Sequence, residues 1–378
     1  MKTTDMPVIK LGGSPHDRGR AYGKTAKSLI ATMVNHWRDN LNRYREDTAS
    51  ALDPDSYLNE FFSQTHYVNA IQRWTPDLWE EVQGIAEGSG QTVDNILGLQ
   101  LIDEEWVFGL RRKLDKPTSK CTAFGVPDAA SGLSYAGQNM DIPSWVDGCQ
   151  VLLRVMPTEN SPEALIFSVA GSLGLNGLNA SGLGITCNTL TQLNASSDGL
   201  PVLFIIRSIL AMNTIDQAEK FLHTIPHASG QNYILSSPAD MRCFECCGTS
   251  VVSYNPAEWQ GRVFHSNHPL VNPDTSELSQ LTLNRLKNTE ARLASISHRL
   301  GDISQSPTLD DVKSALAAHD DPHNPVSRNN TQDGNPIGFT AGSSIYELGA
   351  QPRLHLAAGP PCETPFEIFD FTHLKKGA

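Results

Sequence analysis

The sequence changes character at one point, where Cys121 follows Lys120. Over residues 1–120, apolar residues recur at helical spacing among many charges. Over residues 121–378, short runs rich in β-branched and aromatic residues are separated by Gly, Asn and Pro, a pattern typical of strands joined by turns. This order of elements favours an α+β fold with mainly antiparallel sheets, because a doubly wound parallel fold would alternate strand and helix.

The first 120 residues predict a series of helices. Apolar residues recur every three or four positions from Tyr22 to Tyr44, which predicts an amphipathic helix of about seven turns. Gly19 and Gly23 stand near its start, where the missing side chains favour close packing against another element. Further helices are expected over 57–71, from residue 76, and over 93–110.

The helix expected from residue 76 has a hydroxyl N-cap, Thr75, and a proline at its first position. Its buried face would consist of Leu78, Val82 and Ile85. Acidic side chains near a helix N-terminus are favoured by the helix dipole. We therefore expect solvated side chains, and no acid–base pair, at Glu80, Glu81 and Glu87.

Beyond Cys121, strands are expected at 121–127, 133–140, 150–156, 164–170, 231–236, 241–247, 250–254, 262–267, 337–347, 352–358 and 365–371. Helices are expected at 199–211, 215–225 and 276–300. Another should follow Thr308, which would form a capping box with Asp311. The stretch 171–190 is rich in Gly and Asn but lacks the G-x-G-x-x-G pattern of a dinucleotide site, and it is interpreted as turns between strands.

Charge and length narrow the class of protein. With a net charge of -12 and no basic tract, the chain offers few contacts to phosphate, so no nucleic acid partner is expected. No run approaches the eighteen or so apolar residues of a membrane span, and the N-terminal segment MKTTDMPVIK lacks the apolar core of a secretory signal. We expect a cytoplasmic protein without a membrane partner, folded as one large domain over 1–378.

The seven cysteines are an odd number in a long chain, which fits reduced thiols better than a disulfide framework. Cys243 and Cys246 form a C-x-x-C pair without a second pair, so alternation along a strand explains them better than zinc. His319 and His323 are separated by a helix-breaking proline, which removes the argument that they share one helix face for a metal. No metal and no cofactor are expected. Taken alone, Cys121 would be a small buried apolar residue.

Several short motifs resemble, in order, those of one enzyme family. They are Gly13-Ser14-Pro15 with Gly19 and Gly23, Glu81-Val82-Gln83-Gly84-Ile85-Ala86-Glu87-Gly88, Cys121-Thr122-Ala123, Gly137-Gln138-Asn139-Met140-Asp141, Gly177-Leu178-Asn179-Ala180-Ser181-Gly182 and Ser266-Asn267-His268. The set is similar to the acyl-coenzyme A:6-aminopenicillanic acid acyltransferase family, peptidase family C45, whose members are N-terminal-nucleophile (Ntn) hydrolases. Beyond residue 270 only Arg328 and the run 340–347 match. No G-x-S-x-G or H-E-x-x-H motif offers a competing chemistry.

The resemblance implies a four-layer αββα sandwich and autoproteolysis between Lys120 and Cys121. Residues 1–120 would become a helical α-chain or propeptide, and 121–378 a β-chain whose N-terminal residue is the nucleophile. The two fragments would form a heterodimer, and a further homo-oligomer is left open. Because the new α-amino group has an ordinary pKa near 8, it could serve as the base for its own thiol.

The resemblance also assigns roles at the site. Cys121 would attack a substrate amide and form a thioester, while Asp141 would hold the terminal ammonium. Asn267 would donate to the oxyanion, since a side-chain amide can bond developing negative charge. Asn188 is a further candidate for a substrate contact. We leave His268 out, because alternation along an extended segment points it away from the side that Asn267 faces.

Three functions stay open at this point. The first is a hydrolase of small N-acyl amides, the second an acyltransferase that passes the acyl group to an amine, and the third a binding protein that is never processed. Lys120 stands where the family usually has glycine, and Ile337-Gly338-Phe339 replaces a Ser-Arg pair of the fungal acyltransferase. Gln138 stands where the more distant bile-salt hydrolases and penicillin V acylases have arginine, so those specificities are not implied.

Overall fold

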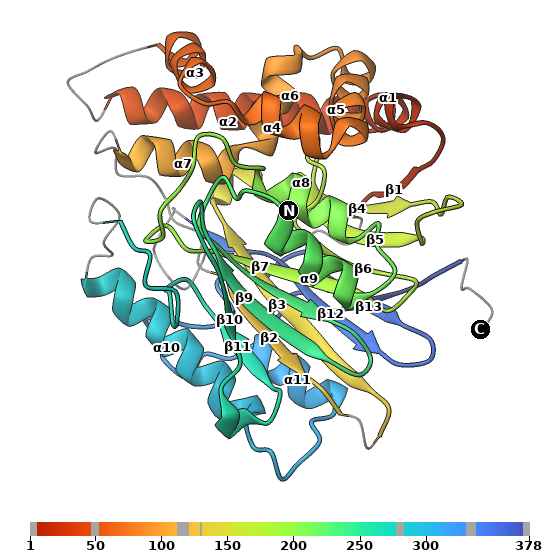
Figure 1. Ribbon diagram of the computed structural model, residues 1–378, viewed down its shortest axis with the longest axis vertical. Helices are drawn as coiled ribbons and strands as arrows, with labels where there is room; N and C mark the ends of the chain where they lie inside the picture. Colours follow the sequence, from red (N-terminus) through yellow and green to blue (C-terminus); the bar gives the residue numbers. More distant parts are fainter. Residues whose placement is uncertain are drawn as a thin grey trace.

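Two β-sheets face each other and helices cover both outer faces (Figure 1). The computed structural model describes residues 6–46, 53–111, 121–128, 131–276, 283–329 and 338–372. From one side to the other, the layers are helices α1 to α9, an eight-stranded sheet, a six-stranded sheet, and helices α10 and α11. This arrangement confirms the predicted αββα fold class.

The eight-stranded sheet has the strand order β1-β4-β5-β6-β7-β8-β9-β10. Only the pair β1–β4 is parallel, and all other pairs are antiparallel. The strands are β1 (Val8–Leu11), β4 (Gln150–Val155), β5 (Ala164–Val169), β6 (Asn176–Asn179), β7 (Gly184–Thr189), β8 (Gln231–Ser236), β9 (Met241–Cys246) and β10 (Val251–Tyr254).

The interpretation of 171–190 as turns is wrong, because this stretch contains β6 and β7. Its asparagines Asn176, Asn179 and Asn188 are buried, and each forms at least one hydrogen bond with a residue distant in sequence. The Nδ2 group of Asn179, for example, donates to the carbonyl oxygens of Leu210 (3.1 Å) and Met212 (2.7 Å). Polar residues that are satisfied by tertiary hydrogen bonds therefore look like turn residues in the sequence.

The six-stranded sheet is antiparallel throughout, with the order β11-β2-β3-β12-β13-β14. Its strands are β2 (Thr122–Val126), β3 (Ser134–Ile142), β11 (Val263–His265), β12 (Phe339–Leu348), β13 (Arg353–Ala357) and β14 (Glu367–Asp370). All six were predicted to within a few residues. Cys121 stands immediately before β2, which lies between β11 and β3 in the sheet.

Nine helices of the described chain lie on the side of the eight-stranded sheet, with α8 and α9 nearest to it in Figure 1. They are α1 (Pro15–Thr25), α2 (Lys27–Glu46), α3 (Pro54–Ser63), α4 (Tyr67–Trp74), α5 (Pro76–Ser89), α6 (Val93–Gln100), α7 (Ile102–Arg111), α8 (Val202–Ile209) and α9 (Ile215–Thr224). The helices predicted over 22–44 and 57–71 are each two helices, since the chain leaves helical geometry at Ala26 and over 64–66. Within the described helices, none is both long and apolar enough to cross a membrane.

Helices α1 and α5 pack through glycines at four-residue spacing on both partners. A Cβ atom at Gly19 would fall on the carbonyl oxygen of Glu81, and one at Gly23 on that of Ile85. Gly84 and Gly88 meet the backbone of α1 in the same way. The close packing expected for Gly19 and Gly23 is confirmed. The element that they pack against is α5, which carries the motif that runs from Glu81 to Gly88.

Glu81 is buried, which corrects the expectation that it is solvated. Its carboxylate pairs with the guanidinium groups of Arg18 on α1 and Arg207 on α8, the latter at 3.1 Å. The charge is compensated by two long-range partners that the helical pattern of α5 cannot reveal. Glu81 therefore joins three helices, whereas Glu80 and Glu87 are exposed as predicted.

The six-stranded sheet is covered by α10 (Leu283–Leu300) and α11 (Leu309–Leu316). Apolar side chains of these helices meet those of the sheet in a separate core that includes Phe124, Phe264, Ile296 and Leu316. The capping box of Thr308 and Asp311 is present as predicted. The predicted start of α10 at 276 falls partly outside the described residues, as does residue 337 of the predicted strand 337–347.

Candidate active site

Cys121 is almost completely buried, with 1% of its surface exposed. Its Sγ atom lies 3.5 Å from the sulfur of Met140 and 3.8 Å from the carbonyl oxygen of Asp141, both on the neighbouring strand β3. Burial, and next the negative charge of Asp141, raise the pKa of the thiol to about 12. The thiol is therefore protonated at neutral pH in the uncut chain. Lys120 lies outside the described residues.

Asp141 is held by the strand that pairs with its own. The hydroxyl of Thr340 on β12 donates to Oδ1 of Asp141 at 2.7 Å, and the same hydroxyl accepts from the backbone N–H of Arg328 at 2.9 Å. Thr340 and Asp141 are direct partners in the sheet register. The carboxylate is buried and fixed in orientation beside the residue predicted as nucleophile.

The side chain of Arg292 on α10 donates hydrogen bonds to four residues of this site. Its Nη1 group donates to the carbonyl oxygen of Cys121 at 2.6 Å and to the hydroxyl of Thr122 at 2.9 Å. Its Nη2 group donates to Oδ1 of Asn267, and Nε to Oδ1 of Asn288, both at 3.1 Å. The side chain is fully buried, and burial lowers the pKa of its guanidinium to about 10, which leaves it protonated at neutral pH.

Asn267 follows β11 and its amide is oriented by Arg292. Because arginine only donates, the Asn267 atom that faces it must be the oxygen, and Nδ2 points the other way. There Nδ2 donates to the carbonyl oxygen of Thr189 at 3.0 Å. The backbone N–H of Asn267 is bonded to the hydroxyl of Thr289 at 2.7 Å. The structure thus brings Cys121, Asp141 and Asn267 into one buried cluster.

Asn188 lies on β7 of the facing sheet. The neighbouring Thr189 reaches the carboxylate of Asp103 on the helical side of that sheet, so alternation directs Asn188 toward the six-stranded sheet. Its Oδ1 accepts from Asn232 at 2.9 Å, while its buried Nδ2 has no acceptor among the described residues. An unused buried donor on this side fits the predicted contact with a substrate.

Two neighbours of the site have structural roles. Gln138 uses both ends of its amide on the backbone of Cys187, with Nε2 at 3.0 Å from the carbonyl oxygen and Oε1 at 2.8 Å from the N–H. It therefore links β3 of one sheet to β7 of the other. His268 lies 3.1 Å from the hydroxyl of Thr289, and burial lowers its pKa to about 4, so it is neutral and remains outside the catalytic group.

Arg292 was not predicted as a site residue from the sequence, because an arginine in a helix is usually an exposed surface charge. A signal was nevertheless present. Thr289, Arg292 and Ile296 follow one another at three- and four-residue spacing, so Arg292 occupies the buried stripe of the helix. A charged residue at an otherwise buried helical position indicates a partner deep in the fold.

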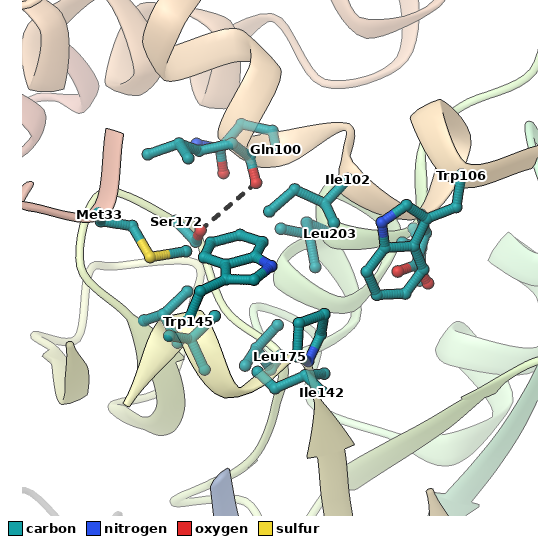
Figure 2. A pocket seen from close by; sticks show the side chains of 15 residues that line it. Met33, Gln100, Ile102, Trp106, Ile142, Trp145, Ser172, Leu175 and Leu203 are labelled. Carbon is teal, nitrogen blue, oxygen red and sulfur yellow. Dashed lines mark hydrogen bonds between the residues drawn. The ribbon is translucent and has the colours of Figure 1, made fainter. Parts of the chain in front are cut away.

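A largely apolar cavity begins beside Asp141, since the following residues Ile142 and Pro143 form part of its wall (Figure 2). Its volume is about 40 Å³, and one water needs roughly 10–15 Å³ on this measure. The lining comes from α2, α6, α7 and α8, from the end of β3 and the segment after it, and from the end of β5 and the loop that leads to β6. It comprises Met33, Leu99, Gln100, Ile102, Asp103, Trp106, Ile142, Pro143, Trp145, Val146, Val169, Ser172, Leu175, Val202 and Leu203.

Two adjacent residues of α7 carry buried carboxyl groups here: Asp103 lines the cavity, whereas Glu104 is not part of its lining. Oδ2 of Asp103 accepts from the hydroxyl of Thr189 (2.7 Å) and from Nε2 of Gln231 (3.0 Å), and burial raises its pKa. Oε1 of Glu104 accepts from the hydroxyl of Ser229 at 2.8 Å. Burial, and then the charge of Asp103, raise the pKa of Glu104 to about 8.

Within the described residues, no group of three or more His, Cys, Asp or Glu side chains could hold a metal ion. Cys243 and Cys246 are buried at β9, and neither forms a disulfide. The hydroxyl, amide, carboxylate and guanidinium groups around Cys121 are suited to orient a thiol and to bond an oxyanion.

The four-layer αββα fold is that of the Ntn-hydrolase class of enzymes, whose members act on amides by acyl transfer or hydrolysis. A sequence model of the family "Acyl-coenzyme A:6-aminopenicillanic acid acyl-transferase" matches residues 130–351, and the chain belongs to this family. The resemblance found in the short motifs is thereby confirmed.

The individual proteins that the chain resembles share only 12–25% of its residues in the aligned regions. The chain is 25% identical over 272 residues to the 40 kDa form of acyl-coenzyme A:6-aminopenicillanic-acid-acyltransferase from Emericella nidulans, a match that covers 71% of each protein. Among solved structures, it is similar to penicillin V acylase from Agrobacterium tumefaciens, with a TM-score of 0.45 and 17% identity over 68% of this chain and 88% of that one. For the R18L variant of conjugated bile acid hydrolase from Clostridium perfringens, the TM-score is 0.44 and the identity 12%, over 67% and 97% of the two chains.

Proposed function

We propose that this protein is a self-processing amidohydrolase whose nucleophile is an N-terminal cysteine, Cys121, and that it cleaves a small N-acyl substrate through a thioester. The observation that carries the proposal is the convergence of three residues on Cys121. Asp141 lies on the strand beside it, Arg292 bonds its carbonyl oxygen, and Asn267 is bonded to the same guanidinium. These groups come from three separate segments of the chain.

In the proposed maturation, the thiol of Cys121 attacks the carbonyl carbon of Lys120. The C–N bond of that peptide breaks, the nitrogen takes a proton and becomes the α-amino group of Cys121, and a thioester remains. Water then hydrolyses the thioester, which restores the thiol and leaves a carboxylate on Lys120. The products are the fragments 1–120 and 121–378.

In the mature enzyme, the α-amino group takes the proton of its own thiol, and the thiolate attacks the substrate carbonyl. Nδ2 of Asn267 donates to the oxyanion, as side-chain amides do at such sites. The leaving amine takes the proton from the terminal ammonium, and the acyl group stays on sulfur. Water then attacks the thioester and releases the acid. Asp141 holds the ammonium when it forms.

Burial of the thiol supports a link between cleavage and activity. In the uncut chain, a pKa of about 12 leaves very little thiolate at pH 7. Cleavage would place a positive charge on the nitrogen of the same residue, and a nearby positive charge lowers the pKa of a thiol. The fraction of thiolate would therefore be larger after processing than in the uncut chain, where the single attack on Lys120 takes place.

The apolar cavity suggests where the acyl part of a substrate binds. Ile142 and Pro143 in its wall follow Asp141 directly, so a carbonyl held at Cys121 can extend its substituent toward Trp145 and Leu203. We favour hydrolysis because water is always present. Two alternatives remain. Transfer of the acyl group to an amine would use the same thioester, and a protein that is never processed would only bind the amide.

The first experiment is the intact mass of freshly purified protein, with N-terminal sequencing of any fragment. We expect species of roughly 13 and 28 kDa, scaled from 41.2 kDa by length, with the larger one beginning at Cys121. Cys121→Ala should give one species of full mass. The matched control is Cys149→Ala, since Cys149 is equally exposed to solvent (1%) but stands immediately before β4 of the other sheet. A stable full-length wild-type protein would contradict self-processing and favour the binding protein.

A second measurement separates hydrolysis from transfer. Acyl 4-nitroanilides are incubated with the processed protein, with and without a high concentration of an added amine, and the acyl products are identified by mass. Free acid in both samples supports hydrolysis, whereas an acylated amine as the main product supports transfer. Activity that is unchanged in Cys121→Ala would refute the thioester.

A further inference from the structure

Glu245 on β9 is a buried acid that the reaction proposed above does not use. Its carboxylate is fully shielded from solvent. Both carboxylate oxygens accept hydrogen bonds from β11 and from the segment directly after it, which carries Asn267. A buried charge is retained only where donors compensate it, so the donors show what Glu245 holds in place.

The carboxylate bonds the chain on both sides of Asn267. Before Asn267, Nε2 of His265 lies 2.8 Å from Oε1 of Glu245. After Asn267, successive backbone N–H groups donate to the carboxylate: that of Leu270 to Oε1 at 2.5 Å, and those of Val271 and Asn272 to Oε2 at 3.1 and 2.7 Å. One side chain of the eight-stranded sheet therefore holds both ends of the segment 265–272.

Further contacts secure the same arrangement. Nδ1 of His265 lies 2.8 Å from the carbonyl oxygen of Ser266. The imidazole thus links Glu245 to the residue directly before Asn267. Burial by itself raises the pKa of Glu245, but the hydrogen bond and charge of His265 and the backbone N–H groups outweigh burial and hold that pKa below its ordinary value. The carboxylate is therefore ionised at neutral pH and acts only as an acceptor.

On the other side, α10 holds Asn267 itself. The backbone N–H of Asn267 donates to the hydroxyl of Thr289 at 2.7 Å, and its Oδ1 accepts from Arg292 at 3.1 Å. These two contacts fix the rotation of the amide, whereas Glu245 fixes the path of the backbone around it. An oxyanion donor must lie within about 2.7–3.1 Å of the developing charge, and a displacement of about 1 Å can cost about 100-fold in rate. The rate therefore depends on this backbone path.

We propose that Glu245 is a positioning residue for Asn267, the donor to the oxyanion. The inference rests on the function proposed above and adds a residue to its machinery. Glu245 acts through the segment 265–272 and takes no part in the bond that is broken at Cys121. A carboxylate that only stabilised the fold would change the amount of folded enzyme, but not the rate of each folded molecule.

The variant Glu245→Gln keeps the size of the side chain but turns an NH2 group toward donors. In either orientation of the amide, at least one backbone N–H of residues 270–272 loses its acceptor. With an acyl 4-nitroanilide, kcat should fall by about 10- to 100-fold at nearly constant KM, because the oxyanion forms only in the transition state. The matched control is Glu258→Gln in η2 (Ala257–Trp259), which is exposed and should keep the wild-type kcat.

A double-mutant cycle with Asn267→Ala separates positioning from a general loss of structure. Because Glu245 acts through the amide of Asn267, Glu245→Gln should lower kcat by less than about threefold in a protein that already lacks this amide. If the two effects multiply, Glu245 acts independently of Asn267 and the inference is overturned. Unchanged kcat in Glu245→Gln, or a higher KM at constant kcat, would overturn it as well.

Two measurements keep the inference testable if Glu245→Gln does not fold. His265→Gln removes the link to Ser266 but keeps the carboxylate, and it enters the same cycle with the same expectation. In the wild type, the backbone N–H groups of residues 270–272 should exchange with solvent at least about 100-fold more slowly than in an unfolded chain. Val271 is the decisive position, since its side chain is 39% exposed while its N–H is bonded to the buried carboxylate. Fast exchange at Val271 would overturn the inference.

Failure of the proposed function can be distinguished from failure of this inference. If amides are cleaved in a Cys121-dependent manner and Glu245→Gln keeps the wild-type kcat, only the inference fails. If no amide is cleaved, hydrogen exchange of the folded variants decides in place of kcat. Exchange over residues 266–272 that is faster by about tenfold or more in Glu245→Gln, but not in Glu258→Gln, would support the positioning of Asn267. Equal exchange in both variants would refute it.

Discussion

Replacing Arg292 by methionine tests the centre of the site, because it removes one side chain that four groups share. The change leaves the carbonyl oxygen of Cys121 and side-chain oxygens of Thr122, Asn267 and Asn288 without their donor. Each unsatisfied buried acceptor costs about 1–3 kcal/mol. Methionine also removes the cost of burying the guanidinium charge, which offsets part of this loss. The shift in the pKa of Arg292 from 12.5 to about 10 corresponds to about 3 kcal/mol of that cost. Four unsatisfied acceptors give about 4–12 kcal/mol, so the net loss is about 1–9 kcal/mol and is centred near 5 kcal/mol, in the range for breaking a buried ionic network.

Denaturant unfolding at pH 7 measures this loss directly as a change in midpoint at constant slope. Arg292→Lys should lose about half as much, because an ammonium keeps the charge but cannot reproduce the fork of the guanidinium. Arg299→Met is the matched control on the same helix. Its partner is the partly exposed Asp320, so the loss should stay below about 1 kcal/mol. A loss below about 1 kcal/mol for Arg292→Met would refute the role assigned to Arg292.

Three further predictions concern buried residues other than Cys121. A carboxyl at Glu104 with a pKa of about 8 is protonated in the folded chain but ionised when unfolded above about 4.5, so stability should fall as pH rises from 5 to 8. Relative to Glu104→Gln, the wild type should lose about 1.4 kcal/mol per pH unit in that window, and parallel pH curves for the two proteins would contradict this. Glu81→Gln should cost about 3–5 kcal/mol in denaturant unfolding, because the buried Arg207 and the partly buried Arg18 lose their counter-charge. The exposed Glu80→Gln should change stability by less than about 0.5 kcal/mol, and equal effects of the two substitutions would contradict the role assigned to the buried carboxylate. Gly84→Ala should lower the midpoint of thermal unfolding by forcing α1 and α5 apart, at a cost of about 1–3 kcal/mol, whereas Gly12→Ala, with its nearest atom at 3.5 Å, should have little effect.

Local sequence patterns were sufficient for most elements. Strands such as β2 and β8 follow from short apolar runs between turn residues, and the capping box at Thr308 follows from two residues three positions apart. The change of pattern at Cys121 located the start of a central strand. Such features depend on neighbours in sequence, so they can be recognised without knowledge of the tertiary structure.

The errors arose where distant residues determine the environment. Glu81 occupies a position that would be exposed on an isolated helix, but Arg18 and Arg207 compensate its charge inside the fold. Asn179 looks like a turn residue, but it is satisfied by backbone carbonyl groups after α8. Arg292 has no local signature beyond its place on a buried stripe. Each case is a polar group whose partner lies far away in sequence.

The same long-range contacts bear on what the proposed cleavage would leave behind. Strand β1, from the first 120 residues, pairs with β4 of the later part. Glu81 is bonded to Arg207 across the same boundary. The cavity is lined from both parts, with Trp106 on one and Trp145 on the other. A segment that completes a sheet, a buried ion pair and an apolar cavity is too costly to release, since its departure would expose apolar surface and leave buried charges unpaired. We therefore expect residues 1–120 to remain as a permanent chain of the enzyme and not as a discarded propeptide.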